Sequence, residues 1–495
     1  MILGSSMVFI DGTVVNVALP ALQREFHATV SGAQWVVESY SLLLASLLLV
    51  GGTAGDRFGR RRVFSTGVAL FALASMWSGL AGSLEQLIVA RAVQGVGGAL
   101  LVPGSLAIIS AAFDEHERGK AIGTWSGFTA ITAAIGPVLG GYLIDHFSWR
   151  YAFLLNIPLA LIVLWLTLRH VPESESRHAG TRLDWPGAVL ASVGLGGLVF
   201  GLIESSDQGW ADPAVAAALL LGVLALAAFV AVEWRSHAPM LPLDLFRSRN
   251  FSGANLLTLM LYAALGATFF FLPLNLIQIQ HYSSTAAGAA LLPFTLIMFT
   301  LSRWSGGLID RYGPKRPLVF GPAIAAAGFL LLAMPGSGRD YWLSFFPGIA
   351  VLGLGMAISV APLTTTVMNA VGNEAAGVAS GVNNAVSRLA GLLAIAALGI
   401  AMRYAFGAAL ELRFSELALP PDASAAVLAQ RGKLAAIDIP STLPAEIREA
   451  MSAAISAAFV FGFRLVMLIC AMLALAASAS AWALISDTRS RPQPR

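Results

Sequence analysis

The chain has 495 residues, of which 57% are hydrophobic and 12% are charged, and its formal net charge is +3. Soluble domains carry about 25% charged residues, so this composition excludes a soluble enzyme, a nucleic-acid-binding protein and a disordered scaffold. The single cysteine, Cys470, excludes an intramolecular disulfide and a cysteine-based metal site. Because the sequence contains no Gly-x-x-x-x-Gly-Lys-Ser/Thr phosphate loop, we expect no ATP-driven pump, and we expect no cofactor or metal.

Apolar runs recur along the whole chain, each of about 20 residues, the length that a helix needs to cross a bilayer. The first run begins at Met1 without a basic leader segment, so we predict a membrane span and not a signal peptide, and a natural start further upstream stays open. The fold class is therefore predicted as an all-α membrane protein with about fourteen transmembrane helices. The predicted spans lie near residues 1–22, 33–54, 63–82, 85–112, 120–144, 150–169, 185–203, 213–233, 251–274, 285–307, 317–335, 341–366, 375–402 and 457–486.

Basic residues gather in the loops on one side of these spans. If residue 1 is cytoplasmic, the loops on that side and the C-terminal tail hold eighteen Arg and Lys residues, whereas the short opposite loops hold Arg24, Arg150 and Arg339. This asymmetry predicts a multi-pass protein of the bacterial inner (cytoplasmic) membrane with both termini in the cytoplasm. The segment 403–456, of mixed charge, then becomes a long external loop, part of which can form amphipathic helix.

An internal repeat divides the chain. An Asp-Arg-aromatic-Gly sequence occurs at Asp56–Gly59 after the second span and again at Asp310–Gly313 after the tenth span. The interval of eight spans is six plus two, which predicts two six-helix halves joined by an inserted helix pair. We therefore expect an N-terminal bundle at 1–170, a linker with the inserted pair at 171–250, and a C-terminal bundle at 251–495.

Charged residues inside a membrane span cost about 2.5–3.5 kcal/mol each at the bilayer centre, so each needs a partner or a water-filled cavity. Asp11 lies mid-membrane and is predicted to couple protons or contact substrate, with a structural polar residue as the alternative. Glu38 is either a cavity carboxylate or part of an interfacial ion pair. At 1.5 Å per residue, Asp11 and Arg91 lie about 16 Å and about 9 Å below the outer end. We therefore expect Arg91 to reach Asp11, or else to bond backbone carbonyls of the first span.

Two other intramembrane charges are Arg303, near a span end, and Arg388, central in the thirteenth span beside a polar stripe that includes Asn384. Arg388 either joins the two halves or binds substrate. A cavity lined by aromatic and amide groups suits amphiphilic organic compounds. The candidate cavity residues are Asn16, Tyr262, Asn384 and Arg388.

Four motifs carry a resemblance to a known family. The sequence Gly-x-x-x-Asp-Arg-Phe-Gly-Arg-Arg at 52–61 resembles the signature loop of the major facilitator superfamily. Residues 11–20 (DGTVVNVALP) and 91–99 (RAVQGVGGA) resemble the first- and fourth-helix motifs of the fourteen-helix drug:proton antiporters. Residues 136–141 (GPVLGG) resemble the fifth-helix antiporter motif. Together they suggest the EmrB/QacA-type drug-resistance subfamily.

The resemblance implies a major facilitator fold that exports amphiphilic compounds or drugs in exchange for protons by alternating access. The alternatives are a transporter of a single metabolite and a membrane sensor without transport. The partners would be protons, the small-molecule substrate and the bilayer, with no nucleic acid, and a periplasmic adaptor protein stays open. The proton-coupling residues would be Asp11, Glu38 and Arg91, and the gating residues would be Gly52, Asp56, Arg57, Gly59, Arg60, Asp310, Arg311, Gly136, Pro137, Gly140 and Gly141.

Two of these implied roles have simpler alternatives. The resemblance implies that Asp56 meets the start of the thirteenth span near residues 373–377, because a helix N-terminus attracts negative charge. Alternatively, Asp56 only offsets the neighbouring arginines. The small residues of 136–141 let a proline-bent helix pack tightly, and close packing alone accounts for them. Exchange with protons rests here on the resemblance.

Overall fold

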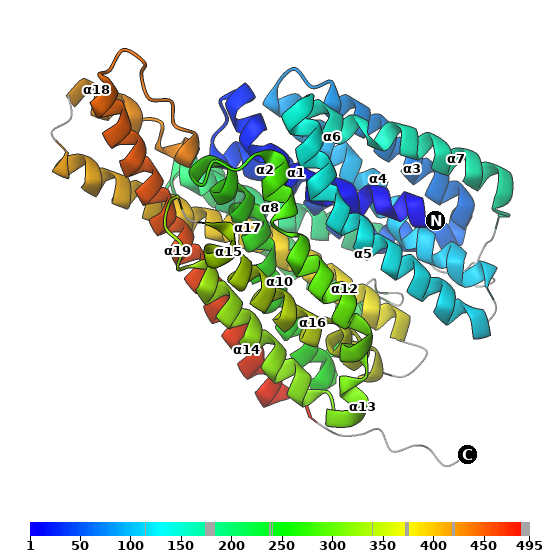
Figure 1. The fold of residues 1–495 in the computed structure, drawn as a ribbon. Coiled ribbons are helices and arrows are strands. Elements are labelled where there is room, and N and C mark those ends of the chain that lie inside the picture. The colour runs from blue at the N-terminus through cyan, green and yellow to red at the C-terminus, as the bar shows by residue number, and fades with distance from the viewer. Residues whose placement is uncertain are drawn as a thin grey trace.

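The computed structural model describes residues 1–113, 115–173, 184–236, 239, 241–338, 340–371, 376–417 and 421–486, apart from the side chains of 110, 115–123, 126, 127, 130, 303, 376, 377 and 421. The Arg303 side chain therefore lies outside the described residues. Within the described part, every regular element is a helix, as the apolar runs predict. Figure 1 shows these helices as elongated bundles, with the N-terminus and α13 toward one end and α18 at the other.

The N-terminal half contains α1 (Ile2–Phe26), α2 (Val30–Phe58), α3 (Arg60–Gly79), α4 (Leu84–Ala112), α5 (Glu115–His146), α6 (Arg150–Leu154) and α7 (Asn156–His170). Side-chain caps set the starts of two of these helices. Thr29 accepts a hydrogen bond from the Gly32 amide at the start of α2, and Ser83 accepts one from the Gln86 amide at the start of α4. The apolar residues between the caps then form the long spans.

The inserted pair consists of α8 (Trp185–Gln208) and α9 (Pro213–Arg235), each capped by an aspartate and carrying a proline within its first two residues. Helix α8 packs along the seam where α2 of the N-terminal half meets α17 of the C-terminal half. There Leu42, Leu195 and Leu392 belong to one buried apolar cluster. Only 11% of the apolar window of α9 is buried, so most of α9 is left to face lipid.

The expected C-terminal half, residues 251–495, starts within α10 (Arg249–Leu274), and the position of its boundary stays a prediction. Its core is a large cluster that includes the buried Phe270, Phe329 and Phe459. The segment 403–456 is partly helical, because α17 continues to Glu416 and α19 begins at Ala445. The elements from 243 onward are η1 (Leu243–Arg247), α10 (Arg249–Leu274), a π-turn η2 (Asn275–Ile279), α11 (Ser284–Ala289), α12 (Leu292–Gly306), α13 (Leu308–Tyr312), α14 (Lys315–Leu332), α15 (Tyr341–Ser344), α16 (Phe346–Asn369), α17 (Ala376–Glu416), α18 (Pro421–Leu428), η4 (Arg431–Ala436) and α19 (Ala445–Leu484).

Twelve helices in the described part are long and apolar enough to cross a membrane. Helices α3 and α5, which correspond to the third and fifth expected spans, are not among these twelve. The count of fourteen spans therefore stays a prediction, and the multi-pass membrane character does not depend on it.

The two copies of the repeated motif have the same local structure. Gly59 ends α2 with φ +101°, and Gly313 ends α13 with φ +75°, a backbone region that side chains rarely adopt. Each preceding arginine lies over the aromatic ring beside it, with 5.3 Å from the Arg57 guanidinium to the Phe58 ring and 5.3 Å from Arg311 to Tyr312.

Two names for the ends of the bundle are used below. The basic end carries the start of α1 and the α2–α3 junction at Gly59. The far end carries the turn between α1 and α2 at residues 27–29. In the described part, hydrogen bonds that join the two halves lie toward the far end, among them one from Gln34 Nε2 to the Ile395 carbonyl (2.6 Å) and one from Gln278 Nε2 to Gln23 Oε1 (2.9 Å).

Candidate transport site

A fully buried ion pair lies inside the N-terminal half. Arg91 and Asp11 are each 1% exposed, and Arg91 Nη1 donates to Asp11 Oδ2 at 2.5 Å. The other carboxylate oxygen of Asp11 accepts from Gln94 Nε2 at 2.8 Å and from Asn156 Nδ2 at 3.2 Å. Asp11 therefore has charge compensation and three donors although it lies within a membrane span.

The guanidinium of Arg91 is enclosed on its remaining sides. It lies 4.2 Å from the centre of the Tyr40 ring and 5.6 Å from that of Phe153, where aromatic faces attract a cation. Its Nε donates to the Val36 carbonyl of α2 at 3.2 Å, so the backbone bond anticipated as an alternative exists, but to α2 and not α1. Arg91 thus both pairs with Asp11 and braces the packing of α4 on α2.

The sequence places these groups together through helical spacing. Arg91 and Gln94 are three residues apart on α4, so both face the same side. The glycine that follows lets α4 approach α2, because a Cβ at Gly95 would lie 2.4 Å from the Tyr40 carbonyl oxygen. Asn156 escaped the sequence analysis, although an amide in the apolar sixth span was a usable signal. It also donates to Ser75 Oγ at 3.0 Å.

Glu38 lies on α2, apart from this network. Its side chain is 0% exposed, and neither carboxyl oxygen has a hydrogen-bond partner among the described residues. The ion pair that was one of its two expected roles is absent from the described part. A buried carboxyl without partners is costly when ionised, which marks Glu38 as a functional candidate.

The segment 136–141 lies where α5 crosses helices of both halves. A Cβ at Gly136 would lie 2.3 Å from Thr13 Oγ1, and one at Gly140 would lie 2.6 Å from Val14 Cγ1, both on α1. A Cβ at Gly141 would lie 2.3 Å from the Ser284 carbonyl oxygen on α11. Conversely, a Cβ at Gly288 on α11 would lie 2.2 Å from the Pro137 carbonyl oxygen. Backbones of opposite halves therefore touch at this crossing.

Asp145 joins the two halves one turn beyond this crossing. Its Oδ1 accepts from the Ser284 amide at 2.9 Å, and its Oδ2 accepts from the Thr285 amide at 2.8 Å and from Thr285 Oγ1 at 2.6 Å. A carboxylate at the end of one helix thus binds the amides that begin α11. The sequence analysis missed Asp145, although an acidic residue just after Gly141 at a span end was visible.

Asp145→Asn is expected to weaken closure of the far end, because the charge that meets the α11 amides is lost. A helix-terminal charge contributes about 0.3–2 kcal/mol, so the closed population should fall by roughly two- to thirty-fold. Spin-label distances across the far end would measure this shift. Asp212→Asn is the matched control, since Asp212 caps α9 away from the seam. Equal distance changes in both variants would contradict the assignment.

At the basic end, the signature loop is held by contacts within the N-terminal half. Asp56 Oδ1 accepts from Arg60 Nε at 2.9 Å and from Arg60 Nη2 at 2.7 Å. Of the expected partners of Asp56, residues 373–377, positions 373–375 and the side chains of 376 and 377 lie outside the described residues. Glu173, which the sequence analysis did not single out, accepts from the Arg61 amide at the start of α3 at 2.9 Å. A Cβ added at Gly52, the first glycine of the motif, would lie 3.6 Å from Pro103 Cβ. This is an ordinary van der Waals distance.

The four proposed cavity residues come from α1, α10 and α17. Asn16 is partly buried and its Oδ1 has no partner among the described residues. Tyr262 packs against the core of the C-terminal half. Asn384 is exposed and Arg388 is partly buried. Among the described residues, no hydrogen bond joins the four, and their shared role stays a prediction.

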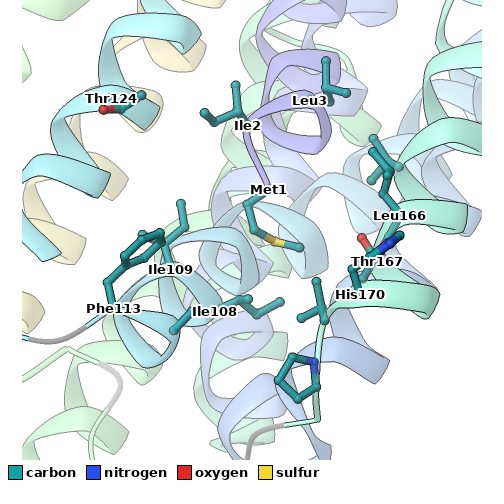
Figure 2. A pocket seen from close by; sticks show the side chains of 14 residues that line it. Met1, Ile2, Leu3, Ile108, Ile109, Phe113, Thr124, Leu166, Thr167 and His170 are labelled. Carbon is teal, nitrogen blue, oxygen red and sulfur yellow. The ribbon is translucent and has the colours of Figure 1, made fainter. Parts of the chain in front are cut away.

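A separate cavity of about 640 Å³ opens at the basic end of the N-terminal half. Figure 2 shows side chains such as Ile2, Ile109 and Leu166 around it, and its polar members are Thr124, Thr167 and His170. The lining comes from α1, α4, α5, α7 and the segment after α7, and it includes none of the four proposed cavity residues.

Two helical halves, a seam closed at one end and an ion pair within one half define a multi-pass membrane transporter that works by alternating access. The family model of the Major Facilitator Superfamily matches residues 1–395. The chain belongs to this family, which makes it a transporter.

Named relatives agree with this membership. The tetracenomycin C resistance and export protein of Streptomyces glaucescens is 34% identical over 486 residues, which are 97% of this chain and 89% of that protein. Multidrug resistance protein Stp of Mycobacterium tuberculosis (strain CDC 1551 / Oshkosh) is 36% identical over 429 residues, 86% of this chain and 79% of that protein. A solved structure of a bacterial homolog of the human lysosomal transporter Spinster, inward-facing and unoccupied, has a TM-score of 0.70 at 17% identity, with 99% and 97% of the two chains covered. That likeness confirms the expected major facilitator fold.

Proposed function

We propose that this protein exports amphiphilic organic compounds from the cytoplasm of a bacterium in exchange for protons, by alternating access across the inner membrane. The relatives named for resistance and export support the direction and the substrate class. The observation that carries the proposal is the Asp11–Arg91 pair, because a carboxylate held at mid-membrane is a group that can bind and release a proton.

Proton exchange at this pair changes the charge balance of the N-terminal half. When Asp11 takes a proton, Arg91 loses its counter-ion, and a buried cation without a partner costs about 3–5 kcal/mol. The Tyr40 ring and Gln94 still hold the guanidinium. The protonated and ionised states of Asp11 therefore favour different packing around Arg91, which is the differential free energy that coupling requires.

The arrangement of the halves fits one state of this cycle. Both termini are taken to be cytoplasmic, so the far end faces the periplasm. The contacts of Gln34, Gln278 and Asp145 then close the protein to the outside. In that state, substrate would enter from the cytoplasmic side.

The test is an efflux assay in a bacterium that lacks its own drug exporters, with a panel of amphiphilic cations, anions and neutral compounds. Cells that express the protein should accumulate less of at least one compound. A protonophore should abolish the difference. Export that survives the protonophore would reject proton coupling, and no export of any compound would favour the sensor alternative.

Asp56→Asn is expected to impair transport without reducing membrane insertion, since Asp56 holds Arg60 at the α2–α3 junction. The loss of a charge at a helix end shifts a balanced equilibrium by roughly two- to thirty-fold. Asp310→Asn should be milder, because Pro314 stands four residues after Asp310 where Arg60 stands four residues after Asp56. Transport rates normalised to the amount of protein in the membrane would measure this ranking. Equal losses would contradict it.

A further inference from the structure

Glu38 lies on the face of α2 that meets the C-terminal half. Gln34, Glu38 and Leu42 are spaced four residues apart, so they share one side of the helix. Gln34 Nε2 donates to the Ile395 carbonyl of α17 at 2.6 Å, and Leu42 belongs to the buried cluster with Leu392 of α17. Glu38 lies between these two contacts, so its carboxyl is buried at the seam between the halves.

Among the residues that the structure describes, no group of opposite charge compensates Glu38. The carboxyl has no hydrogen bond and no ion pair among the described residues. Arg91 is bound to Asp11, and Arg403 is bound to Asp207. The charged and titratable groups on α2 and on the elements packed against it near this level are Tyr40, Asp11, Arg91, Glu204, Asp207, Arg388, Arg403 and Lys433. An ionised carboxylate without a partner is disfavoured where water is excluded. The closed seam therefore accommodates Glu38 in its neutral, protonated form.

Asp11 differs from Glu38 in what happens when the halves move. All three donors to Asp11 belong to helices of its own half, α4 and α7. Rigid rotation of one half against the other leaves these bonds in place. By contrast, separation of α2 from α17 at the far end would bring water to Glu38 and allow it to ionise.

We propose that Glu38 is a second proton-binding residue, which must be protonated before the far end can close. This inference rests on the proposed alternating access, and it assigns Glu38 to the control of closure, separate from the exchange at Asp11. Because the closed state holds one more proton than the open state, raising the external pH favours the open far end. For one proton, the ratio of open to closed molecules can rise by at most about tenfold per pH unit.

The experiment measures the far-end distance by electron spin resonance across a range of external pH. Spin labels at Gly82→Cys and Met334→Cys report it, since both positions are exposed at the far end of opposite halves, while the native Cys470 is buried. The otherwise unchanged protein should populate the open distance increasingly as the pH rises. Glu38→Gln should shift toward the closed distance and lose the part of the pH dependence that Glu38 supplies, and Glu38→Leu, a second neutral variant, should do the same.

Glu204→Gln is the matched control, because Glu204 also lies near the seam but accepts a hydrogen bond from Trp35 at 2.8 Å. It should retain the dependence on pH. A dependence as steep in Glu38→Gln as in the unchanged protein, or the absence of any dependence from the unchanged protein, would overturn the inference. Efflux assays in parallel separate the two claims: protonophore-resistant export with a Glu38-dependent distance change would reject the proposed function and leave this inference standing.

Discussion

Asp11→Asn is expected to abolish proton-driven accumulation of substrate while substrate binding remains measurable. Asparagine keeps the shape of the side chain and can still accept a bond from Gln94 or Asn156. It cannot exchange a proton, and it leaves Arg91 without a counter-ion, a penalty of about 3–5 kcal/mol when a buried pair is broken. We therefore expect at least a hundredfold loss of concentrative transport, since about 2.7 kcal/mol already corresponds to that factor.

The measurement uses protein in sealed vesicles with an imposed proton gradient, together with equilibrium binding of the same substrate in detergent. Glu25→Gln serves as the control, because Glu25 is a carboxylate on the same helix but lies at the far end, bonded to Trp149 and Arg150. Its transport should stay within a few-fold of the unchanged protein. If Asp11→Asn still concentrates substrate against a gradient, Asp11 is not the coupling site, and Glu38 would take over that role.

The contact between Asp11 and Arg91 could be predicted from the sequence, but the other residues around the pair could not. Helical rise alone placed Asp11 and Arg91 at depths that differ by about 7 Å, within reach of an arginine side chain, and the two groups are in contact. Asn156 was missed because nothing in the order of residues says which face of the sixth span meets α1. The depth of a residue in the membrane follows from its position along one helix. A contact between two residues depends also on how both helices are rotated about their axes.

Contacts between the halves were harder to predict for the same reason. Asp145 and Thr285 are 140 residues apart, and no local pattern pairs them. The expected attraction between a carboxylate and a helix N-terminus was assigned to Asp56 at the basic end, and a contact of this kind occurs with Asp145 at the far end. The long segment 403–456 also contained more helix than its mixed charge suggested, since α17 and α19 extend into it by packing against each other.

Gly288→Ala and Gly141→Ala are expected to prevent full closure of the far end and to reduce transport strongly. A methyl group at Gly288 would lie 2.2 Å from the Pro137 carbonyl oxygen, and one at Gly141 would lie 2.3 Å from the Ser284 carbonyl oxygen. Both obstacles are backbone atoms of the opposite half, which cannot rotate away as a side chain can. Overpacking of this kind costs about 1–3 kcal/mol, so the closed population should fall by roughly five- to more than a hundredfold.

Two further alanine variants separate a defect of closure from a general packing defect. Gly12→Ala should transport normally, since nothing lies within 4 Å of its added methyl group. Gly140→Ala would meet only the Val14 side chain of its own half, at 2.6 Å, so it should lower thermal stability while the spin-label distance across the far end is unchanged. Gly288→Ala should instead lengthen that distance and slow export together, because α5 and α11 can no longer meet. Normal export by Gly288→Ala would mean that the crossing opens and closes elsewhere along α5, and that the small residues of 136–141 serve packing within the N-terminal half alone.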